Sequence, residues 1–471
     1  MMPADTATLL RQYTYTLLPW QVGAIPAGTR HSCDSNQGTI ERTLDRLLQA
    51  ASRAPRNHVV LMGLADGRLA EALATKLPDD RMLTVVECIP QTVRSVYASS
   101  LLQTDSDAPL KQTSLWWMQG RHTLLCDNSL KALMLLLHLT GRTPDRTTML
   151  LNPHISPTER TPYKQLQRLM LSTYSLAADH PSTPDAGIST TGIQPSTPLE
   201  CNKRPTATSE AETDTSSIPS IPVDNTPFFQ ASGNTHSEPV LKKLSICAIL
   251  HPTEPHLDDF FAQLPDAREV VILWDAETIP AYAPKTACTV RQYARPLQGN
   301  FAAQRNAVLQ YVSGEWLFFI DGDERLTSEQ WQGVSAIMKK ADEQNIGGVL
   351  FPRQTYWPDE EHVLAGFGLW PDMQLRLLRA CPTLAFTRPV HEVITGTTGK
   401  LAIAPALPIE HFSRLYKDEV MLAQKLQIFD AAAGHRQHRL NNKYPSLPTQ
   451  FFRSLTSHYK TDHLLLFHQN G

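Results

Sequence analysis

The chain has 471 residues, of which 41% are hydrophobic and 19% are charged. Its 43 basic and 46 acidic side chains give a formal net charge of −3. Such a balance gives no global electrostatic attraction to nucleic acid, so a nucleic-acid partner is not expected. No apolar stretch approaches the roughly 18 residues needed to cross a bilayer, so at most peripheral membrane contact is expected.

The seven cysteines are widely scattered, and no two of them have C-x-x-C spacing. This pattern argues against a zinc site or a dithiol redox motif and suits the reducing cytoplasm. The first twenty residues contain no apolar block long enough for a signal peptide. We therefore expect a cytoplasmic protein that can also act at the inner face of the membrane.

Residues 1–174 alternate apolar runs with helical patterns. Strands are predicted at HVVLMGL, MLTVVE, HTLLCD and TTMLLNP, and helices at GRLAEALATKL and SLKALMLLLHL. The second helix is apolar nearly all round, so it should be buried. Strands that alternate with helices predict a parallel sheet with crossover helices, which makes this part a Rossmann-like α/β domain.

The first strand and helix of this domain flank a glycine-containing turn. VVLMGLADGRLAEAL contains Gly63 and Gly67, and Glu87 lies where a ribose-binding acid would follow, about 20 residues later. The segment resembles a methyltransferase-like domain, or the glycosyltransferase-associated domain of motility accessory factors. Asp66 would repel a phosphate but not a methyl-donor nucleoside. The favoured interpretation is a structural or acceptor-handling domain.

Residues 175–243 differ sharply in composition from the rest. They are rich in Pro, Ser and Thr, contain PSTP twice, and have few aromatic residues. Such a stretch buries too little apolar surface to offset its ordering entropy. We predict a disordered linker between two domains.

Residues 244–435 repeat the α/β alternation. The predicted strands are LSICAIL, EVVILW, WLFFI and GGVLFP, and the predicted helices are LDDFFAQL, FAAQRNAVLQYV, SEQWQGVSAIMKKADEQ and residues 415–433. This gives a second α/β domain with its own core, followed by a C-terminal extension at 436–471. The fold class is α/β, with two domains joined by a linker.

WLFFI leads directly into Asp321-Gly322-Asp323-Glu324. Ligands of open α/β sheets bind outside the carboxyl ends of the strands, so these carboxylates are candidate site residues. Two carboxylates with one residue between them can approach one divalent cation, which can bridge a diphosphate. An acidic turn after a strand is common, so this motif alone is weak.

The segment from Phe301 to Thr327 resembles the family 2 glycosyltransferases of the GT-A fold, most closely the branch of lipopolysaccharide-core glucosyltransferases. The matching residues are Gln304, Arg305, Asn306, Gly314, Glu315, Trp316, Asp321, Asp323 and Glu324. LWPDMQLRLLR, RPVHEVI and PIEHF match later motifs of that branch in order. The resemblance covers nearly all of Leu244 to Asp430, about two fifths of the chain.

The resemblance implies a nucleotide-diphospho-sugar donor, an Mn²⁺ or Mg²⁺ cofactor, and an inverting transfer. It implies Asp323 and Asp321 as metal ligands, with His391 or His411 as a further ligand. Asp275, Arg305, Asn306 and Asp321 are the expected donor-binding residues, and Trp370, Gln374 and Arg376 are the expected acceptor-binding residues. A carboxylate downstream of the acidic motif should act as base.

Asp372 is the first candidate for this base and Glu392 is the rival. The structural alternatives are that Asp372 caps a helix and that His391 is a core histidine. Two turns depart from the family pattern: His251-Pro252-Thr253-Glu254 stands after the first strand, and Asp275-Ala276-Glu277-Thr278 after the second. These departures leave the identity of the donor open.

The sequence therefore predicts a glycosyltransferase that acts on a surface-glycan, lipopolysaccharide, lipid-linked or protein acceptor. Two alternatives remain open. One is a bifunctional protein with an N-terminal S-adenosylmethionine-dependent methyltransferase. The other is a non-catalytic carbohydrate-binding scaffold built on a decayed transferase, which the altered turn after Asp275 suggests.

Overall fold

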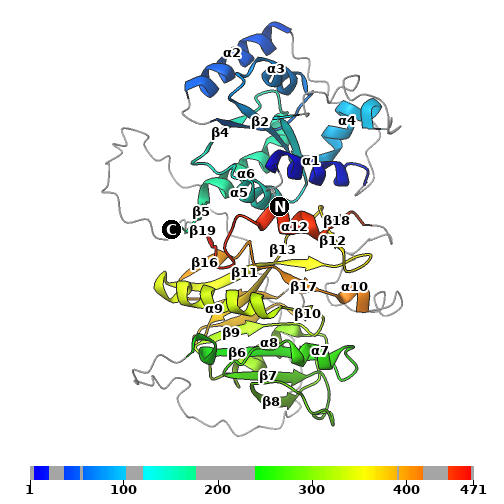
Figure 1. The fold of residues 1–471 in the computed structure, drawn as a ribbon, viewed down its shortest axis with the longest axis vertical. Coiled ribbons are helices and arrows are strands. Elements are labelled where there is room, and N and C mark those ends of the chain that lie inside the picture. The colour runs from blue at the N-terminus through cyan, green and yellow to red at the C-terminus, as the bar shows by residue number, and fades with distance from the viewer. Residues whose placement is uncertain are drawn as a thin grey trace, which may run out of the picture. The chain divides into compact units, whose positions relative to one another are not determined.

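A computed structural model describes residues 5–20, 37–53, 57–101, 120–176, 239–389, 392–416 and 444–467. Within these residues the protein is α/β, with a smaller parallel sheet in the N-terminal part and a large mixed sheet in the C-terminal part (Figure 1). This confirms the predicted fold class. Most of the predicted linker, residues 177–238, lies outside the described residues.

The N-terminal sheet has the strand order β3-β2-β1-β4, and each described pairing in it is parallel. Its strands are β1 (His58–Met62), β2 (Met82–Glu87), β3 (Thr123–Cys126) and β4 (Thr147–Leu151). The four predicted strands are thereby confirmed. The order places β4 beside β1, so the strand order reverses between these two strands, as it does in a doubly wound sheet.

In the described residues of this part, six α-helices accompany the sheet. They are α1 (Thr6–Leu17), α2 (Gln37–Arg53), α3 (Arg68–Lys76), α4 (Pro90–Leu101), α5 (Leu130–Leu139) and α6 (Arg160–Ser172). Ser129 caps α5 by accepting a hydrogen bond from the Ala132 amide at 3.3 Å, and residues 132–139 are all buried, as predicted. The sequence analysis did not assign α1, which packs against β3.

The large sheet has the order β5-β19-β16-β11-β13-β9-β6-β7-β8. The strands are β5 (Thr173–Ser175), β6 (Leu244–Leu250), β7 (Glu269–Trp274), β8 (Thr289–Ala294), β9 (Trp316–Phe319), β11 (Ile346–Thr355), β13 (Asp372–Arg379), β16 (Lys400–Ile403) and β19 (Leu465–Phe467). β8, β7, β6 and β9 are parallel, and they repeat the 3-2-1-4 order of the first sheet. β13 runs antiparallel to β9 and β11.

Shorter strands lie beside this sheet. They are β10 (Glu324–Arg325), β12 (His362–Leu364), β14 (Ala385–Thr387), β15 (Val393–Thr395), β17 (Ile409–His411) and β18 (Ser446–Pro448). β17 pairs with both β10 and the end of β11, so it ties the acidic motif to the sheet.

The helices of the C-terminal part are α7 (Leu257–Ala262), α8 (Phe301–Leu309), α9 (Ser328–Glu343), α10 (Ser413–Tyr416) and α12 (Thr449–Thr456). Local sequence explains where two of them begin. The Asn300 side chain caps α8, and Thr327 and Gln330 form a capping box at α9. Only the first residues of the helix predicted at 415–433 are described.

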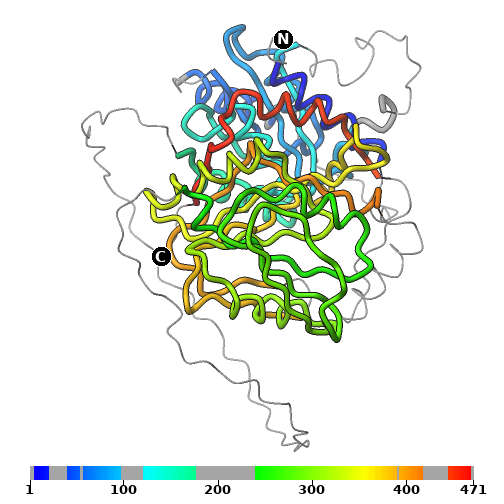
Figure 2. Tube along the Cα trace, turned by 60° about the horizontal axis from the view of Figure 1, so that its bottom comes forward, coloured from blue at the N-terminus to red at the C-terminus, as the bar shows by residue number. Residues whose placement is uncertain are grey.

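The C-terminal extension links the two parts of the chain. β19 pairs with β16 on one side and with β5 on the other, and α12 lies beside α1 (Figures 1 and 2). Tyr13 of α1 stacks with Phe451 of α12 at 6.1 Å between ring centroids. One hydrophobic cluster therefore includes residues from both parts. The domain boundaries proposed from the sequence remain a prediction.

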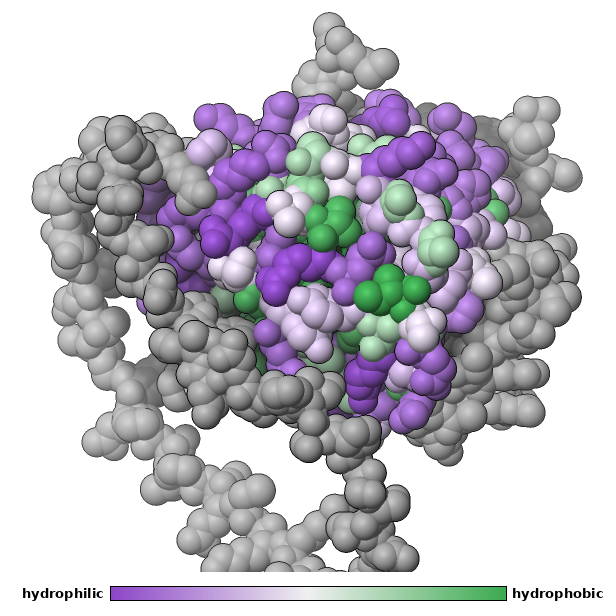
Figure 3. Space-filling model, turned by 90° about the horizontal axis from the view of Figure 1, so that it is seen from below, coloured by the Kyte–Doolittle hydropathy of each residue, from purple (hydrophilic) through white to green (hydrophobic). Residues whose placement is uncertain are grey.

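The described surface offers little apolar area. On the face in Figure 3, hydrophobic residues appear as separate spots within a mostly hydrophilic surface. The exposed large hydrophobic residues in the described ranges are Tyr15, Leu171, Ile279 and Val393, which come from different elements. Across the described part of the chain, no helix has the length and apolar character needed to cross a bilayer.

Candidate active site

The acidic motif lies where the order of the parallel strands reverses. β6 and β9 are neighbours although β7 and β8 lie between them in the sequence, and Asp321 follows shortly after the end of β9. This is the topological switch point at which open α/β sheets bind ligands. A Cβ on Gly322 would lie 2.8 Å from a side-chain carbon of Glu254. Glycine therefore lets the motif approach the loop after β6 closely.

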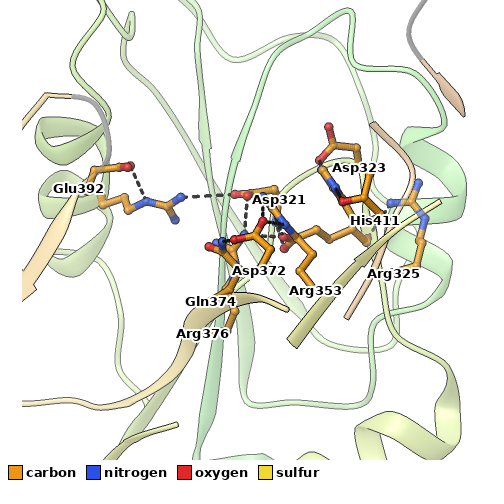
Figure 4. A network of polar contacts seen from close by, with 12 residues as sticks. Asp321, Asp323, Arg325, Arg353, Asp372, Gln374, Arg376, Glu392 and His411 are labelled. Atoms are coloured by element: carbon orange, nitrogen blue, oxygen red, sulfur yellow. Dashed lines mark hydrogen bonds and ion pairs between the residues drawn. The ribbon is translucent and has the colours of Figure 1, made fainter. Parts of the chain in front are cut away.

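Asp321 lies between two arginines that come from different elements (Figure 4). Its carboxylate is 2.5 Å from Arg376 Nη2 of β13 and 3.4 Å from Arg305 Nη2 of α8. Burial raises the pKa of Asp321, but the charges of Arg376 and Arg305 outweigh it and hold the pKa well below its usual range. About a third of the Asp321 side chain remains exposed, so the ionised carboxylate can be reached from solvent.

A chain of ion pairs continues from Arg376 towards β11. Arg376 Nη2 also lies 2.5 Å from Glu324 Oε1, and Arg353 Nη1 lies 3.3 Å from the same oxygen. Glu324 is fully buried, and the Nε of Arg376 is buried without a hydrogen-bond partner. The sequence analysis did not single out Arg353. The feature of the sequence that could have indicated Arg353 is its charged side chain directly after the apolar run GGVLFP.

Asp372 is held at the other end of this network. It stands opposite Arg353 in the β11–β13 register, and its Oδ2 accepts hydrogen bonds from Arg353 Nη2 at 2.5 Å and Nε at 2.9 Å. Gln374 Nε2 donates to Oδ1 at 2.7 Å. Burial raises the pKa of Asp372, but the charge of Arg353 and these hydrogen bonds lower it below its usual value. Asp372 begins a strand, so the alternative that it caps a helix is wrong.

Glu392, the rival candidate, lies at the opposite end of the network. Its Oε1 is 2.9 Å from Arg305 Nε, so Arg305 bridges Glu392 and Asp321 (Figure 4). The structure thus brings together five predicted site residues: Arg305, Asp321, Asp372, Gln374 and Arg376, with Glu392 at the edge. Glu324 of the same acidic motif joins them, and the structure adds Arg353, which the sequence analysis did not single out.

Asp323 points towards another partner. Its carboxylate lies 3.5 Å from His411 Nε2, and His411 Nδ1 shares a hydrogen bond with the Thr355 hydroxyl at 2.8 Å. Burial and the nearby charge of Arg353 lower the pKa of His411, which favours the neutral imidazole. His411 is therefore a second group that can share a cation with Asp323, as the sequence analysis allowed.

The fit of these residues to a divalent cation is incomplete as the side chains stand. Within the described ranges, no group of three or more His, Cys, Asp or Glu side chains is placed to hold a metal ion. His391, a predicted ligand, lies outside the described residues. The donor set itself suits Mg²⁺ or Mn²⁺, because Asp321 and Asp323 offer oxygen atoms. Asp321 would exchange its bond to Arg376 for a bond to the cation.

Two predicted donor-binding residues have structural partners. Asp275 follows β7, and its carboxylate accepts a hydrogen bond from the Leu297 amide at 2.7 Å. The Asn306 side chain binds both the amide and the carbonyl group of Phe386, each at 2.8 Å. Asp275 lies at the carboxyl end of a parallel strand, whereas Asn306 joins α8 to β14.

Trp370 has a different setting from the one expected for a residue that stacks on a sugar. It is 2% exposed, and its ring packs edge-on against Tyr13 and Phe452 at 6.3 and 5.2 Å between centroids. This packing places Trp370 in the core shared by the two parts of the chain. The AGFGLWP segment is therefore held by the burial of Trp370 in this core, and Trp370 does not line an acceptor cleft.

The glycine-containing turn of the N-terminal sheet is closed by the protein itself. Glu87 is fully buried and accepts hydrogen bonds from the Leu64 and Ile89 amides, at 2.8 and 2.7 Å, and from the Tyr163 hydroxyl. A Cβ on Gly63 would lie 2.1 Å from the Ile155 side chain, which shows how closely Ile155 covers this turn. Glu87 is thus held by donors of the protein itself, and Ile155 packs directly against the backbone of the turn.

Among known proteins, matches to this chain come from solved structures. No protein-family model matches the chain, and no curated protein matches it. Crystal structures of S. aureus TarS do match. TarS 1–349 aligns at 17% identity over 29% of this chain and 47% of that chain, with a TM-score of 0.21.

The same TarS fragment in complex with UDP aligns at 12% identity, over 46% of this chain and 70% of that chain, with a TM-score of 0.24. In complex with UDP-GlcNAc it aligns at 20% identity, over 25% of this chain and 36% of that chain, with a TM-score of 0.20. This chain thus spans about half the length of TarS 1–349 or less in two of these three alignments. At such TM-scores the likeness carries no argument about this chain.

Proposed function

We propose that residues 244–435 form a GT-A-type glycosyltransferase domain that moves a sugar from a nucleotide-diphosphate donor to a hydroxyl group of a glycan, lipid-linked or protein acceptor. The observation that carries this proposal is the position of Asp321. It stands at the switch point of a parallel 3-2-1-4 sheet, partly exposed, between two guanidinium groups. The motifs from Phe301 to Phe412 support the same class of reaction.

The arginines suit the charge of the donor. A nucleoside diphosphate carries several anionic oxygens, and guanidinium groups bind such oxygens through charge-assisted hydrogen bonds. Arg305 and Arg376 face Asp321 from α8 and β13, so a diphosphate bound there would meet both. Asp275 lies on the same edge of the sheet, after β7, and is our candidate for the ribose or the base.

A divalent cation belongs to this proposal, with Asp321 and Asp323 as its first ligands. The network supports it through its charge. Asp321, Glu324, Asp372 and Glu392 face three guanidinium groups, and Asp323 adds a fifth carboxylate beside neutral His411 and a fourth guanidinium group, that of Arg325. An excess of negative charge remains for a cation to balance. When bound, the cation would stabilise the charge that develops on the leaving nucleotide.

An inverting transfer also needs a carboxylate that takes the proton of the acceptor hydroxyl. We assign this role to Asp372, because Arg353 and Gln374 fix its orientation and its lowered pKa keeps it ionised at neutral pH. The same pairing lowers its basicity, so Glu392 remains the competitor. The two differ in position, since Glu392 contacts Arg305 on the donor side of the network.

One observation favours a second function, a carbohydrate-binding scaffold without turnover. Each of Asp321, Asp372 and Glu392 is paired with an arginine. A decayed site could keep such pairs. A methyltransferase in the N-terminal part is less favoured, because Glu87 is committed to Leu64, Ile89 and Tyr163.

The proposal is tested by a screen of nucleotide sugars for release of the nucleoside diphosphate, with Mn²⁺ or Mg²⁺ and with excess chelator. We expect Asp323→Asn to lower kcat by about 10²–10³-fold, the scale on which a transition-state charge contact is lost. Glu315→Gln is the matched control, because Glu315 flanks β9 at its other end and its side chain is 57% exposed.

Full turnover in chelator would remove the cation from the proposal. Binding of a nucleotide sugar without turnover under any condition would favour the scaffold. Wild-type turnover in Asp323→Asn would show that the acidic motif is not the reaction centre.

A further inference from the structure

The carboxyl end of β3 in the N-terminal sheet touches the segment that leads to Asp372. Asp127, directly after β3, accepts a hydrogen bond through Oδ1 from the Phe367 amide at 3.2 Å, although 240 positions separate the two residues. Asp127 is fully buried, and its Oδ2 accepts a hydrogen bond from the Tyr13 hydroxyl at 2.5 Å. The carboxylate therefore joins α1, β3 and residues 365–371, which we call the 365–371 loop.

We propose that Asp127 is a positioning residue for the proposed transferase site, and that it acts by holding the 365–371 loop in the one shape that presents Asp372 to Arg353. The inference rests on the proposed function for its effect on turnover. The effect of Asp127 on the conformation of the 365–371 loop can be measured without an activity assay. It also gives the N-terminal sheet a role that needs no cofactor of its own.

The backbone of the loop shows why it needs such a hold. Gly366, Phe367 and Gly368 all have positive φ angles, of +70°, +52° and +83°. Glycine adopts these angles readily, but for Phe367 the left-handed conformation is sterically strained. A strained residue persists only where its surroundings determine its conformation. The hydrogen bond from the Phe367 amide to Asp127 is such a determinant.

Neighbouring contacts fix the loop on both sides of Phe367. A Cβ on Gly366 would lie 2.1 Å from the Leu17 side chain of α1, so α1 packs directly against the loop backbone. Trp370 is buried between Tyr13 and Phe452. Asp372 is two residues beyond Trp370, and it meets Arg353 in the register of β11 and β13. A shift of the loop would therefore move Asp372, the first residue of β13, away from Arg353.

Glu87 offers a matched control on the same sheet edge. Glu87 ends β2, and Asp127 directly follows the adjacent parallel strand β3. Both are fully buried, and both accept three hydrogen bonds. Among the described residues, the hydrogen-bond partners of Glu87 lie in the N-terminal part, whereas Asp127 bonds to the 365–371 loop. The two substitutions should damage the N-terminal sheet equally and the loop unequally.

The experiment compares Asp127→Ala, Asp127→Asn, Glu87→Ala and wild type in the full chain. Hydrogen exchange of the amides in residues 365–371 is measured first, without substrate. We expect Asp127→Ala to speed exchange in this segment by about 10-fold or more, the scale of one hydrogen bond to a charged group. Asp127→Asn keeps an oxygen for the Phe367 amide and should restore protection, and Glu87→Ala should leave the segment near wild type.

Turnover is measured on the same proteins. The loop leads into Asp372 at the start of β13, whereas Arg376 further along that strand is held by Asp321 and Glu324, and Arg305 and Asp275 lie on other elements. Asp127→Ala should therefore lower kcat by about 10- to 100-fold with an unchanged KM for the donor. Asp127→Asn should recover most of it. Equal exchange in Asp127→Ala and Glu87→Ala would overturn the hold on the loop. Faster exchange with normal turnover would overturn the positioning role.

Two further outcomes distinguish a failure of the proposed transferase function from a failure of the proposed role of Asp127. If wild type turns over no nucleotide sugar, the proposed function fails while the exchange result still decides whether Asp127 holds the loop. If Asp127→Ala does not fold, Tyr13→Phe replaces it, because it removes the hydroxyl that orients Asp127 and leaves the ring against Trp370. Tyr13→Phe should give a smaller change in the same direction, and no change would overturn the proposal.

Discussion

The two sheets of this protein share one strand order and use the same edge of it in opposite ways. Both contain four parallel strands in the order 3-2-1-4, with acidic residues after their carboxyl ends. In the N-terminal sheet, Glu87 and Asp127 are fully buried and bind backbone amides and tyrosine hydroxyls. In the C-terminal sheet, Asp321 is partly exposed and binds arginines.

This difference shows that the strand order and the bonding partners of the carboxylates determine separate properties of the sheet edge. Strand order decides where side chains gather, because the carboxyl ends of parallel strands meet at one edge. The partners decide what the edge can do. Buried carboxylates with fixed neutral donors hold parts of the chain together, whereas exposed carboxylates with long cationic partners can exchange them for a ligand. The predictions below test this contrast.

The largest effect is expected from Arg376→Met. This substitution removes the Arg376 guanidinium group from both Glu324 and Asp321. Buried Glu324 then keeps its ion pair with Arg353, and Asp321 loses its closest positive charge. Breaking one side of a buried ion pair costs about 3 kcal/mol or more. We expect urea unfolding at pH 7 to show a loss of this size in the free energy of unfolding.

Arg379→Met is the control for that loss. Arg379 lies on the same strand, but its partner Asp342 is on the surface and about a third of each side chain is exposed. Exposed pairs contribute about 1 kcal/mol or less. Equal losses in both variants would show that the acidic edge of the large sheet is not held by its buried arginine network.

The next effect concerns the base. Asp372→Asn should lower kcat by about 10²-fold, the usual scale for loss of a general base, with donor binding near normal. Because the pKa of Asp372 lies below its usual value, the acid limb of the kcat profile should not show a group titrating above about pH 4 from this residue.

Glu392→Gln is measured beside it as the competing assignment. A normal kcat in Asp372→Asn together with a large loss in Glu392→Gln would reverse the two roles. Normal turnover in both would mean that neither carboxylate takes the proton. Circular dichroism of both variants separates these results from unfolding.

The strands were easier to predict than the contacts. Apolar runs such as HVVLMG and WLFFI predicted β1 and β9, because buried parallel strands are nearly continuous in apolar residues. β8, with the sequence TVRQYA, was missed because it lies at the sheet edge and is only partly buried. α1 was also missed. Its apolar face is buried partly by α12, from the other end of the chain.

The site shows the same limit. The sequence located Asp321 and Arg376, because both lie in recognisable motifs after or within strands. It did not find Arg353, whose role depends on the register between β11 and β13, or Asp127, whose partner Phe367 is 240 positions away. It also expected Trp370 at an acceptor cleft, whereas the ring lies in a core that forms only when both parts of the chain meet.

The last prediction is that the two edges respond to pH with opposite sign. Burial raises the pKa of Glu87 to about 7, even though its three hydrogen bonds lower it. A carboxyl group with a raised pKa binds its proton more tightly in the folded state. It therefore contributes stability at low pH, and this contribution is lost as the pH rises from about 4.5 to about 7. Asp321 behaves oppositely, because its lowered pKa contributes stability that is lost as the pH falls below about 4.

The comparison of wild type with Glu87→Gln isolates the first of these effects. Glutamine does not titrate, so the difference in the free energy of unfolding between the two proteins should change by about 3 kcal/mol from pH 4.5 to pH 8. Wild type should become less stable relative to Glu87→Gln as the pH rises. Urea unfolding at steps of half a pH unit measures it. Parallel curves would mean that Glu87 is ionised throughout this range. Its amide and hydroxyl donors would then outweigh its burial, and this edge would resemble the acidic edge of the large sheet.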